Sequence, residues 1–346
     1  MYPLSRNGVA LSLLFTSSLS FGAEKSNKQM QAVLDELGAL KGKPIETLSP
    51  EEARKQPSPD IAVKNLMTKK NIQPPKSTVT TQDIEIDGAS GKIAARVYKP
   101  GNKTNLPLVV YYHGGGFVIA TNDTYDATPR SLSQMTDAIW LSVEYRKAPE
   151  NKFPAAHDDA FAAYQWALKN AASLGADPKR IAVAGESAGG NLALNVAIMA
   201  RDKGVPLPLH EVLVYPVAGN DMNTASYRDN ADAKPLNKPM MAWFVKHYTR
   251  TEADTKDPRI NLLAADLKGL NPATIITAQV DPLRSEGKEL ARKLEEAKVK
   301  VKYKNYEGVA HEFFGMATVV DEAKDAQDLA ADELKDALKA NRSAGR

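Results

Sequence analysis

The sequence predicts an α/β fold in which helices flank a mostly parallel central sheet. From Thr78 onward, short apolar segments with strand character alternate with segments long enough to form helices. Such alternation is typical of β-α-β units, whose strands pair in parallel. Residues 106–112 are almost continuously apolar, as expected for a strand that is covered on both faces. With 43% hydrophobic and 25% charged residues, the chain can form the large core that this fold needs.

Each element is predicted from its own local pattern. Strands are expected where apolar residues alternate or run together between turn residues, and helices where apolar residues recur every three or four positions. The strand candidates are residues 79–86, 93–98, 106–112, 138–143, 181–184, 212–215, 273–280 and 299–303. The helix candidates are residues 155–171, 191–201, 286–296 and 321–341.

Lysines at positions 298, 300, 302 and 304 alternate with apolar residues in and around the last strand candidate. A nucleic-acid-binding stripe would have this pattern, and so would an outer strand whose solvated face is protected by lysines. The net charge is only +3 over 346 residues, and so small an excess does not indicate a nucleic-acid partner. We therefore expect an outer strand and no nucleic-acid binding.

The chain contains no cysteine. Disulfides, thiolate metal centres and a cysteine nucleophile are therefore excluded. The sequence also has no H-E-x-x-H motif and no closely spaced histidine pair, so nothing in it indicates a metal site. We expect neither a metal nor another cofactor, and the sequence leaves the oligomeric state open.

Residues 1–23 have the layout of a secretory signal peptide. A single charged residue, Arg6, precedes the apolar run 9–15, and small and polar residues follow up to Ala23. The apolar run is shorter than the roughly 20 residues that cross a bilayer. A frayed segment and a retained membrane anchor are the alternatives. We expect a periplasmic or secreted protein with no stable membrane insertion after cleavage.

A G-x-S-x-G motif formed by Gly185, Ser187 and Gly189 carries the strongest chemical signal. It lies between a strand candidate and a helix candidate, which is the context of a nucleophile elbow. In so sharp a turn the glycines leave room for neighbouring atoms, and the serine hydroxyl projects from the turn. A glycine-rich turn with a solvated serine is the alternative interpretation.

A second motif, His113-Gly114-Gly115-Gly116, follows the apolar strand 106–112. Consecutive glycines can turn their N–H groups toward a substrate oxygen, and such donors stabilise the oxyanion of a tetrahedral intermediate. A flexible turn would have the same sequence. The motif precedes the G-x-S-x-G by about 70 residues and, like it, stands at a strand end, which favours a catalytic interpretation of both.

A serine nucleophile needs a base, and the base needs an orienting acid. In the chain order typical of this elbow, the acid and then the histidine follow the serine. Of the five histidines, only His210, His247 and His311 follow Ser187. His210 opens a strand candidate and His247 lies in an aromatic stretch, so His311 is the best base. Asp281 directly follows a strand candidate and fits the acid. Alone, Asp281 could cap a helix and His311 could lie in a surface loop; together they favour a triad.

These motifs make the chain similar to the hormone-sensitive-lipase-like family of α/β-hydrolases, the bacterial family IV esterases. The resemblance covers about residues 106–314. Besides the two glycine motifs, it rests on Tyr-Arg-Lys-Ala-Pro-Glu at 145–150, Phe-Pro-Ala-Ala at 153–156, Asp-Pro-Leu-Arg-Ser-Glu-Gly at 281–287 and His-Glu-Phe at 311–313.

The resemblance implies an α/β-hydrolase fold and a role for each site residue. Ser187 would be the nucleophile, His311 the general base and then acid, and Asp281 the orienting acid. The oxyanion hole would be formed by N–H groups of Gly114, Gly115 and Ala188. The supporting positions would be His113, Gly116, Gly185 and Gly189.

The resemblance also implies a helical cap, which residues 24–76 and an insert at about 218–266 would form. Prolines break the first of these segments into short helices. Residues 77–342 would form the α/β-hydrolase domain that contains the insert. The acyl and alcohol pockets depend on the cap, so the sequence leaves the natural substrate open.

Four residues depart from the common family pattern. Lys147 replaces a leucine, Glu186 the aspartate of one large subgroup, Ser285 a second acid after Asp281, and Glu312 a glycine. None of these departures removes a reacting group. We expect Glu186 to have little effect on the chemistry, whereas Ser285 could change the support of the loop that carries the acid.

The motifs together predict a serine carboxylesterase that hydrolyses short-chain acyl esters through an acyl-enzyme. An amidase or deacylase would use the same triad, and the sequence does not separate ester from amide. A non-catalytic ligand-binding homologue is a third possibility, against which the complete set of Ser187, Asp281 and His311 counts. The expected partner is a small-molecule ester.

Overall fold

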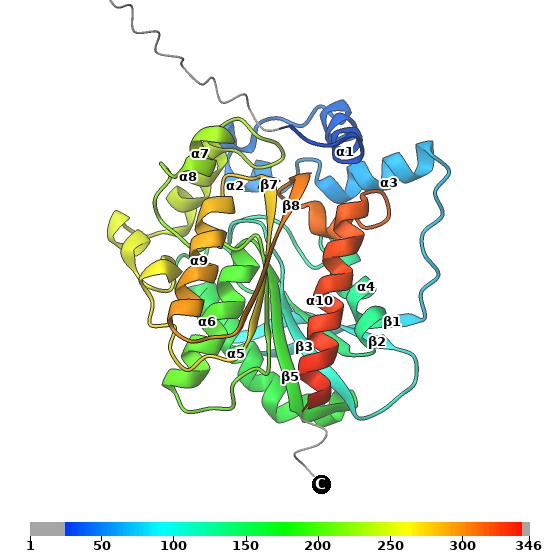
Figure 1. The fold of residues 1–346 in the computed structure, drawn as a ribbon, viewed down its shortest axis with the longest axis vertical. Helices are drawn as coiled ribbons and strands as arrows, with labels where there is room; N and C mark the ends of the chain where they lie inside the picture. The colour runs from blue at the N-terminus through cyan, green and yellow to red at the C-terminus, as the bar shows by residue number, and fades with distance from the viewer. Residues whose placement is uncertain (1–24, 341–346) are drawn as a thin grey trace, which may run out of the picture.

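A computed structural model describes residues 25–340, which form one eight-stranded sheet with helices on both faces (Figure 1). The strand order is β1-β2-β4-β3-β5-β6-β7-β8. Strand β2 is antiparallel to β1 and β4, and all other neighbours are parallel, which confirms the predicted mostly parallel sheet. The strands are β1 (Val79–Gly88), β2 (Gly91–Pro100), β3 (Leu106–Tyr112), β4 (Ile139–Val143), β5 (Ala176–Glu186), β6 (Glu211–Val214), β7 (Ala273–Val280) and β8 (Val301–Ala310).

Helices pack on each face of the sheet and around one end of it (Figure 1). The α-helices are α1 (Lys28–Ala39), α2 (Pro50–Ala53), α3 (Pro59–Lys69), α4 (Ala127–Thr136), α5 (Ala155–Asn170), α6 (Ala188–Asp202), α7 (Ala225–Asp229), α8 (Lys238–Tyr248), α9 (Arg284–Glu296) and α10 (Asp321–Ala340). The short 3-10 helices are η1 (Ile45–Thr47), η2 (Ala171–Leu174), η3 (Glu252–Lys256), η4 (Leu262–Ala264) and η5 (Phe313–Met316).

Two hydrophobic cores, one on each face, hold the layers together. Apolar side chains of α5, α6 and α9 belong to one core, and those of α1, α3, α4 and α10 belong to the other. Strand β3 contributes to both, because successive side chains of a strand point to opposite faces. Leu108 and Val110 join the first core, whereas Val109 and Tyr111 join the second. The near-continuous apolar run of this strand is thereby explained.

Helices α1, α2 and α3 of the first predicted cap segment and α7 and α8 of the second lie at the end of the sheet where β7 and β8 end (Figure 1). The two segments touch each other, since the indole N–H of Trp243 in α8 donates to the Leu48 carbonyl at 3.0 Å. Arg54, which follows α2, also ties the N-terminal segment to the rest of the chain. Its guanidinium forms two 2.8 Å hydrogen bonds with the Glu150 carboxylate and donates to the Val118 carbonyl at 2.9 Å.

Several element bounds differ from the sequence-based expectation. Helix α4 was not predicted, because its sequence is rich in Ser and Thr and contains Pro129, which makes it look like a loop. Helix α6 begins at Ala188, directly after the serine, and not at Asn191. Strand β8 extends to Ala310, past the last lysine. It is an edge strand of the sheet with Lys302 and Lys304 exposed, which confirms the expected outer strand.

The predicted signal peptide at residues 1–23 lies outside the described residues. Across residues 25–340, no helix combines the length and the apolar character that crossing a membrane requires.

Glu211 at the start of β6 is fully buried. Its backbone N–H donates to the Pro272 carbonyl at 3.2 Å, but neither carboxyl oxygen has a hydrogen-bond partner in the described part of the chain. Burial raises the pKa of Glu211 well above its ordinary value, because the ionised form would lose its hydration without gaining a partner. The folded protein therefore retains a proton here that the unfolded chain releases.

Replacing Glu211 with glutamine should remove this proton linkage. Because the folded state binds the proton more tightly, this group lowers the free energy of unfolding by up to about 1.4 kcal/mol per pH unit as pH rises above ~4.3. Urea denaturation between about pH 5 and pH 8 should show Glu211→Gln gaining stability over the wild type as pH rises. The exposed residue Glu85 offers the control variant Glu85→Gln, which should track the wild type. A stability difference for Glu211→Gln that does not grow with pH would contradict the buried proton.

Candidate active site

The register of the parallel strands brings three chain segments to one edge of the sheet. Glu186 at the end of β5 pairs with Val214 of β6, and Val280 at the end of β7 pairs with Ala310 at the end of β8. The residues that directly follow β5, β7 and β8 are Ser187, Asp281 and His311. Neighbouring parallel strands thus deliver all three side chains to the same place, which is the usual position of a site in such sheets.

Ser187 occupies a sharp turn between β5 and α6. Its backbone has φ 56° and ψ −117°, a conformation that is strained for a residue with a side chain. The two glycines of the motif make the turn possible. A Cβ on Gly185 would lie 2.1 Å from the Gly189 carbonyl oxygen, and a Cβ on Gly189 would lie 1.9 Å from the Tyr112 carbonyl oxygen. Neither position has space for a larger residue.

A chain of hydrogen bonds links Ser187, His311 and Asp281. The Ser187 Oγ lies 3.0 Å from Nε2 of His311, and Nδ1 of His311 lies 2.7 Å from Oδ2 of Asp281. The other carboxylate oxygen, Oδ1, accepts the Leu283 N–H at 2.8 Å. All three linked side chains are buried. This geometry lets the imidazole take the serine proton while the carboxylate fixes the orientation of the ring.

The charge balance around His311 favours its protonated form. Burial lowers its pKa, but the charge of Asp281 and the hydrogen bond to it outweigh burial and raise the pKa above its ordinary value. Glu312 and Glu186 act in the same direction. An imidazolium formed during a reaction would therefore be stabilised in place.

The glycine loop after β3 faces the serine turn. Gly115 and Gly116 have φ 98° and 58°, and the Gly115 carbonyl accepts the N–H groups of Val118 at 3.0 Å and Ile119 at 2.9 Å. Among residues 25–340, the N–H groups of Gly114, Gly115 and Ala188 donate to no backbone or side-chain acceptor. These donors are thus available to an incoming oxygen.

His113 lies under this loop and not at the serine. It is fully buried, its Nδ1 lies 2.8 Å from the Gly114 carbonyl oxygen, and its ring stacks on Tyr145 with 4.6 Å between centroids. The Tyr145 hydroxyl donates to the His113 carbonyl at 2.9 Å. The His113 side chain therefore contacts and stabilises the glycine loop, in line with the supporting role that the resemblance implies.

A cleft of about 940 Å³ opens onto Ser187 and His311. Gly115 and Gly116 line it on one side. The segments 34–63 and 232–244 line it on the others, so both parts of the predicted cap contribute to its walls. A substrate bound in this cleft would lie against the serine, the histidine and the available N–H groups at once.

Comparison with known proteins places this geometry in a family. A family model described as alpha/beta hydrolase fold matches residues 109–315. Carboxylesterase NlhH of Mycobacterium tuberculosis is 40% identical over 271 residues, which cover 77% of this chain and 85% of that protein. The chain belongs to the hormone-sensitive-lipase-like α/β-hydrolases. The family assignment made from the motifs is thus confirmed, and the chain is a carboxylic ester hydrolase.

Other relatives of this hydrolase are also esterases. The ethyl acetate hydrolase of Pseudomonas putida is 31% identical over 313 residues, which cover 88% of this chain and 96% of that protein. The crystal structure of a thermostable esterase from Pseudomonas putida ECU1011 has a TM-score of 0.83 and 34% identity, with 92% of this chain and 99% of that chain covered. The similarity therefore extends over nearly the whole fold.

Two other histidines of the hydrolase have hydrogen-bond partners away from Ser187. His157 is buried between the Tyr248 hydroxyl at 2.7 Å and the Asn191 amide oxygen at 2.9 Å, and His210 bonds the Thr274 hydroxyl at 2.8 Å. Burial lowers the pKa of each to about 4. Sequence order alone leaves His210 and His247 as candidates for the base, and the structure places neither at Ser187.

The loop that carries Asp281 is supported by Ser285, which the motifs include, and by Ser226, which they did not single out. Ser226 of α7 donates its hydroxyl to the Pro282 carbonyl at 2.6 Å and accepts the Ser285 N–H at 3.0 Å. The Ser226 N–H in turn donates to the Ser285 hydroxyl at 3.1 Å. The departure at Ser285 therefore replaces a charged support by a reciprocal pair of serine contacts with the insert. No sequence pattern could have revealed this pair, since its members are 59 residues apart.

Glu286 joins the same support. It is buried and its Oε1 accepts the N–H groups of Ala218 at 2.8 Å and Gly219 at 3.2 Å. Burial raises the pKa of Glu286 to about 8. The start of the insert is thus anchored to α9, next to the acid loop.

Lys147, the one basic residue among the four departures, donates to the Ala120 carbonyl at 2.8 Å and pairs with Glu144. It stabilises the segment that follows the glycine loop.

Proposed function

We propose that this hydrolase cleaves short-chain acyl esters through an acyl-enzyme on Ser187. The observation that carries the proposal is the hydrogen-bonded chain from Ser187 through His311 to Asp281 at the floor of the cleft. In the first step, Nε2 of His311 takes the hydroxyl proton as Oγ attacks the ester carbonyl carbon. The developing oxyanion accepts hydrogen bonds from the available N–H groups of the glycine loop and of Ala188.

Collapse of the tetrahedral intermediate breaks the bond to the alcohol oxygen, and His311 gives the proton to that oxygen. Water then attacks the acyl carbon while His311 again acts as the base, which releases the acid and restores the serine. The names of the relatives support an ester substrate over an amide, since they describe carboxylesterases and an ethyl acetate hydrolase.

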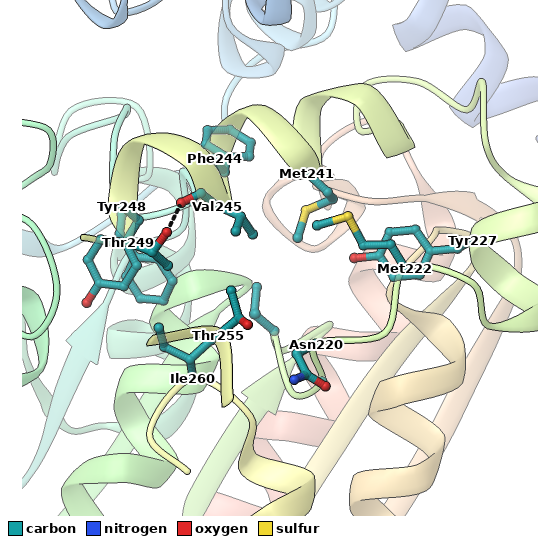
Figure 2. Close-up of a pocket in the computed structure, with 14 residues that line it drawn as sticks. Asn220, Met222, Tyr227, Met241, Phe244, Val245, Tyr248, Thr249, Thr255 and Ile260 are labelled. Atoms are coloured by element: carbon teal, nitrogen blue, oxygen red, sulfur yellow. Dashed lines mark hydrogen bonds between the residues drawn. The ribbon is translucent and has the colours of Figure 1, made fainter. Parts of the chain in front are cut away.

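A small apolar cavity beside the cleft supports the short-chain limit. Its volume is about 60 Å³, and Figure 2 shows that Met222, Met241, Tyr227 and Ile260 surround it beneath α8. Gly116, Val217, Met241 and Phe244 line both this cavity and the cleft. A Cβ on Gly116 would lie 2.3 Å from the Phe244 ring, so the ring packs directly on the glycine loop. We infer that the acyl chain lies in the cleft. Phe244 and Met241 would form the end of its pocket, between the cleft and the small cavity.

Removal of the serine hydroxyl should abolish hydrolysis. Loss of a triad nucleophile lowers kcat by on the order of 10⁶-fold, so Ser187→Ala should show no turnover of p-nitrophenyl butyrate above background. A serine-directed organophosphate should add one phosphoryl group to the wild type, and mass spectrometry of peptides should locate it on Ser187. A control variant, Ser173→Ala, changes an exposed residue of η2 and should react like the wild type. Labelling of another serine would exclude Ser187 as the nucleophile.

The acyl chain length should have a maximum that depends on Phe244. Each buried methylene contributes about 0.8 kcal/mol, or roughly fourfold in kcat/KM, until the pocket is full. In a p-nitrophenyl ester series, kcat/KM should rise or hold from acetate to about hexanoate and then fall.

One variant should move this maximum and a second substitution should move it back. Phe244→Ala joins the small cavity to the cleft and should shift the optimum to longer chains, whereas Phe244→Ala with Met222→Phe refills that cavity and should return the optimum to shorter ones. Palmitate preferred over butyrate in the wild type would show an open lipase groove instead.

We also propose that the hydrolase is exported, because residues 1–23 have the pattern of a signal peptide. In a bacterial host, fractionation and mass spectrometry should find a periplasmic protein that starts at Ala23 or Glu24. Charges placed in the apolar run, Leu13→Arg with Leu14→Arg, should leave it in the cytoplasm with its N-terminus intact. An unprocessed wild-type chain in the cytoplasm would exclude export.

A further inference from the structure

Two glutamates adjoin the residues that react. Glu186 directly precedes Ser187, and Glu312 directly follows His311. Glu186 is buried, whereas Glu312 is partly exposed, and both line the cleft. Glu186 stands where one large subgroup of the family has aspartate, and Glu312 stands where many members have glycine.

Glu186 is held by two tyrosine hydroxyls. Tyr111 donates to its Oε1 at 2.6 Å, and Tyr215 donates to its Oε2. The Tyr215 ring lies against the His311 imidazole, with 4.4 Å between centroids and 45° between planes. Its backbone N–H is also fixed, because it donates to the Ile276 carbonyl at 2.6 Å. Glu186 therefore fixes the hydroxyl end of Tyr215, whose ring packs against the His311 imidazole.

Glu312 makes the corresponding contact on the other side of the site. Its Oε1 accepts the Tyr125 hydroxyl at 2.5 Å. That hydroxyl is pressed against the glycine loop, since a Cβ on Gly114 would lie 2.2 Å from it. Glu312 thus holds a tyrosine beside a loop whose N–H groups face the cleft.

Burial shifts the pKa values of these glutamates and tyrosines, and the tyrosines keep the protons that they donate. Burial raises the pKa of Glu186 to about 7, against the lowering effect of the Tyr111 and Tyr215 hydroxyls. Burial likewise raises the pKa values of Tyr215 and Tyr125 well above their ordinary range, so both remain hydrogen-bond donors. The titratable groups near His311 in the described part of the chain are the carboxyl groups of Asp281, Glu312, Glu186 and Glu286 and the hydroxyl of Tyr215.

We propose that Glu186 and Glu312 are positioning residues, which hold Tyr215 against the His311 imidazole and Tyr125 against the oxyanion loop. The inference rests on the proposed triad function, which it extends to the two flanking acids. Neither tyrosine exchanges a proton in the reaction. They restrict the motion of the groups that do, and a small displacement of such groups has a large effect on rate.

A set of conservative variants tests the proposal: Tyr215→Phe, Glu186→Gln, Tyr125→Phe and Glu312→Gln. The matched control is Tyr112→Phe, because Tyr112 is equally buried and donates at 2.8 Å to the Ala160 carbonyl, in the core on the opposite face of the sheet from Tyr111. Thermal unfolding first establishes that every variant is folded at the assay temperature. The readouts are kcat, KM and the acid limb of kcat/KM for p-nitrophenyl butyrate.

We expect Tyr215→Phe and Glu186→Gln to lower kcat about tenfold relative to Tyr112→Phe, with KM unchanged, because they loosen the base and do not touch substrate. Tyr125→Phe and Glu312→Gln should lower kcat in the same way through the oxyanion loop. Negative charge near His311 raises its pKa, so both glutamine variants should also move the acid limb to lower pH. Tyr215→Phe keeps the carboxyl group and should leave that limb in place.

If these residues only stabilised the fold, the folded variants would keep the wild-type kcat, KM and acid limb of kcat/KM. The proposal is overturned if the four variants match Tyr112→Phe in kcat within about twofold, or if the glutamine variants keep the wild-type acid limb. Wild type and Ser187→Ala are assayed alongside. An inactive wild type would refute the proposed function itself, whereas an active wild type with unaffected tyrosine and glutamate variants would refute only the positioning role.

Discussion

The arrangement of the rest of the site depends on the strained backbone turn at Ser187. A residue with a side chain is held at φ 56° only where its surroundings over-determine that conformation. Here the Ser187 N–H donates to the Val214 carbonyl at 2.9 Å and its carbonyl accepts the Val217 N–H at 3.1 Å. Strand β6 and the residues after it thus clamp the turn from both sides. The serine hydroxyl can then project into the cleft while the helix that follows presents its first N–H groups beside it.

A buried base in this position needs compensating negative charge, and the fold supplies it from several elements. Asp281 comes from the end of β7, Glu186 from β5 and Glu312 from the residue after the base. Each carboxyl group loses hydration on burial, which is offset by hydrogen bonds from the Leu283 N–H or from tyrosine hydroxyls. Each acid near the histidine therefore depends on neutral hydrogen-bond donors as well as on charge interaction with the imidazole.

The sequence predicts which residues form the hydrogen-bonded triad better than it predicts what supports them. Glycine spacing and strand ends identify Ser187, Asp281 and His311, because a sharp turn and a parallel register restrict which residues can stand there. The partners of Glu186 were out of reach, since Tyr111 and Tyr215 meet it from strand β3 and from the turn after β6 and resemble ordinary core residues. Helix α4 was missed for a similar reason, because tertiary packing and not local propensity determines it.

The catalytic groups and the substrate walls are built by different kinds of contact. Strand ends and short hydrogen bonds fix the triad atoms, whereas apolar and charged side chains of the N-terminal segment and apolar side chains of α8 line the cleft. Close packing tolerates changes of shape when volume is conserved, but a hydrogen-bonded network does not tolerate the loss of one member. Phe244 and Gly116 are where the two kinds of structure meet, because the ring that borders the small apolar cavity rests on the loop proposed to bind the oxyanion. A change in the cap at this point would therefore affect both which acyl chain fits and how well its carbonyl oxygen is held.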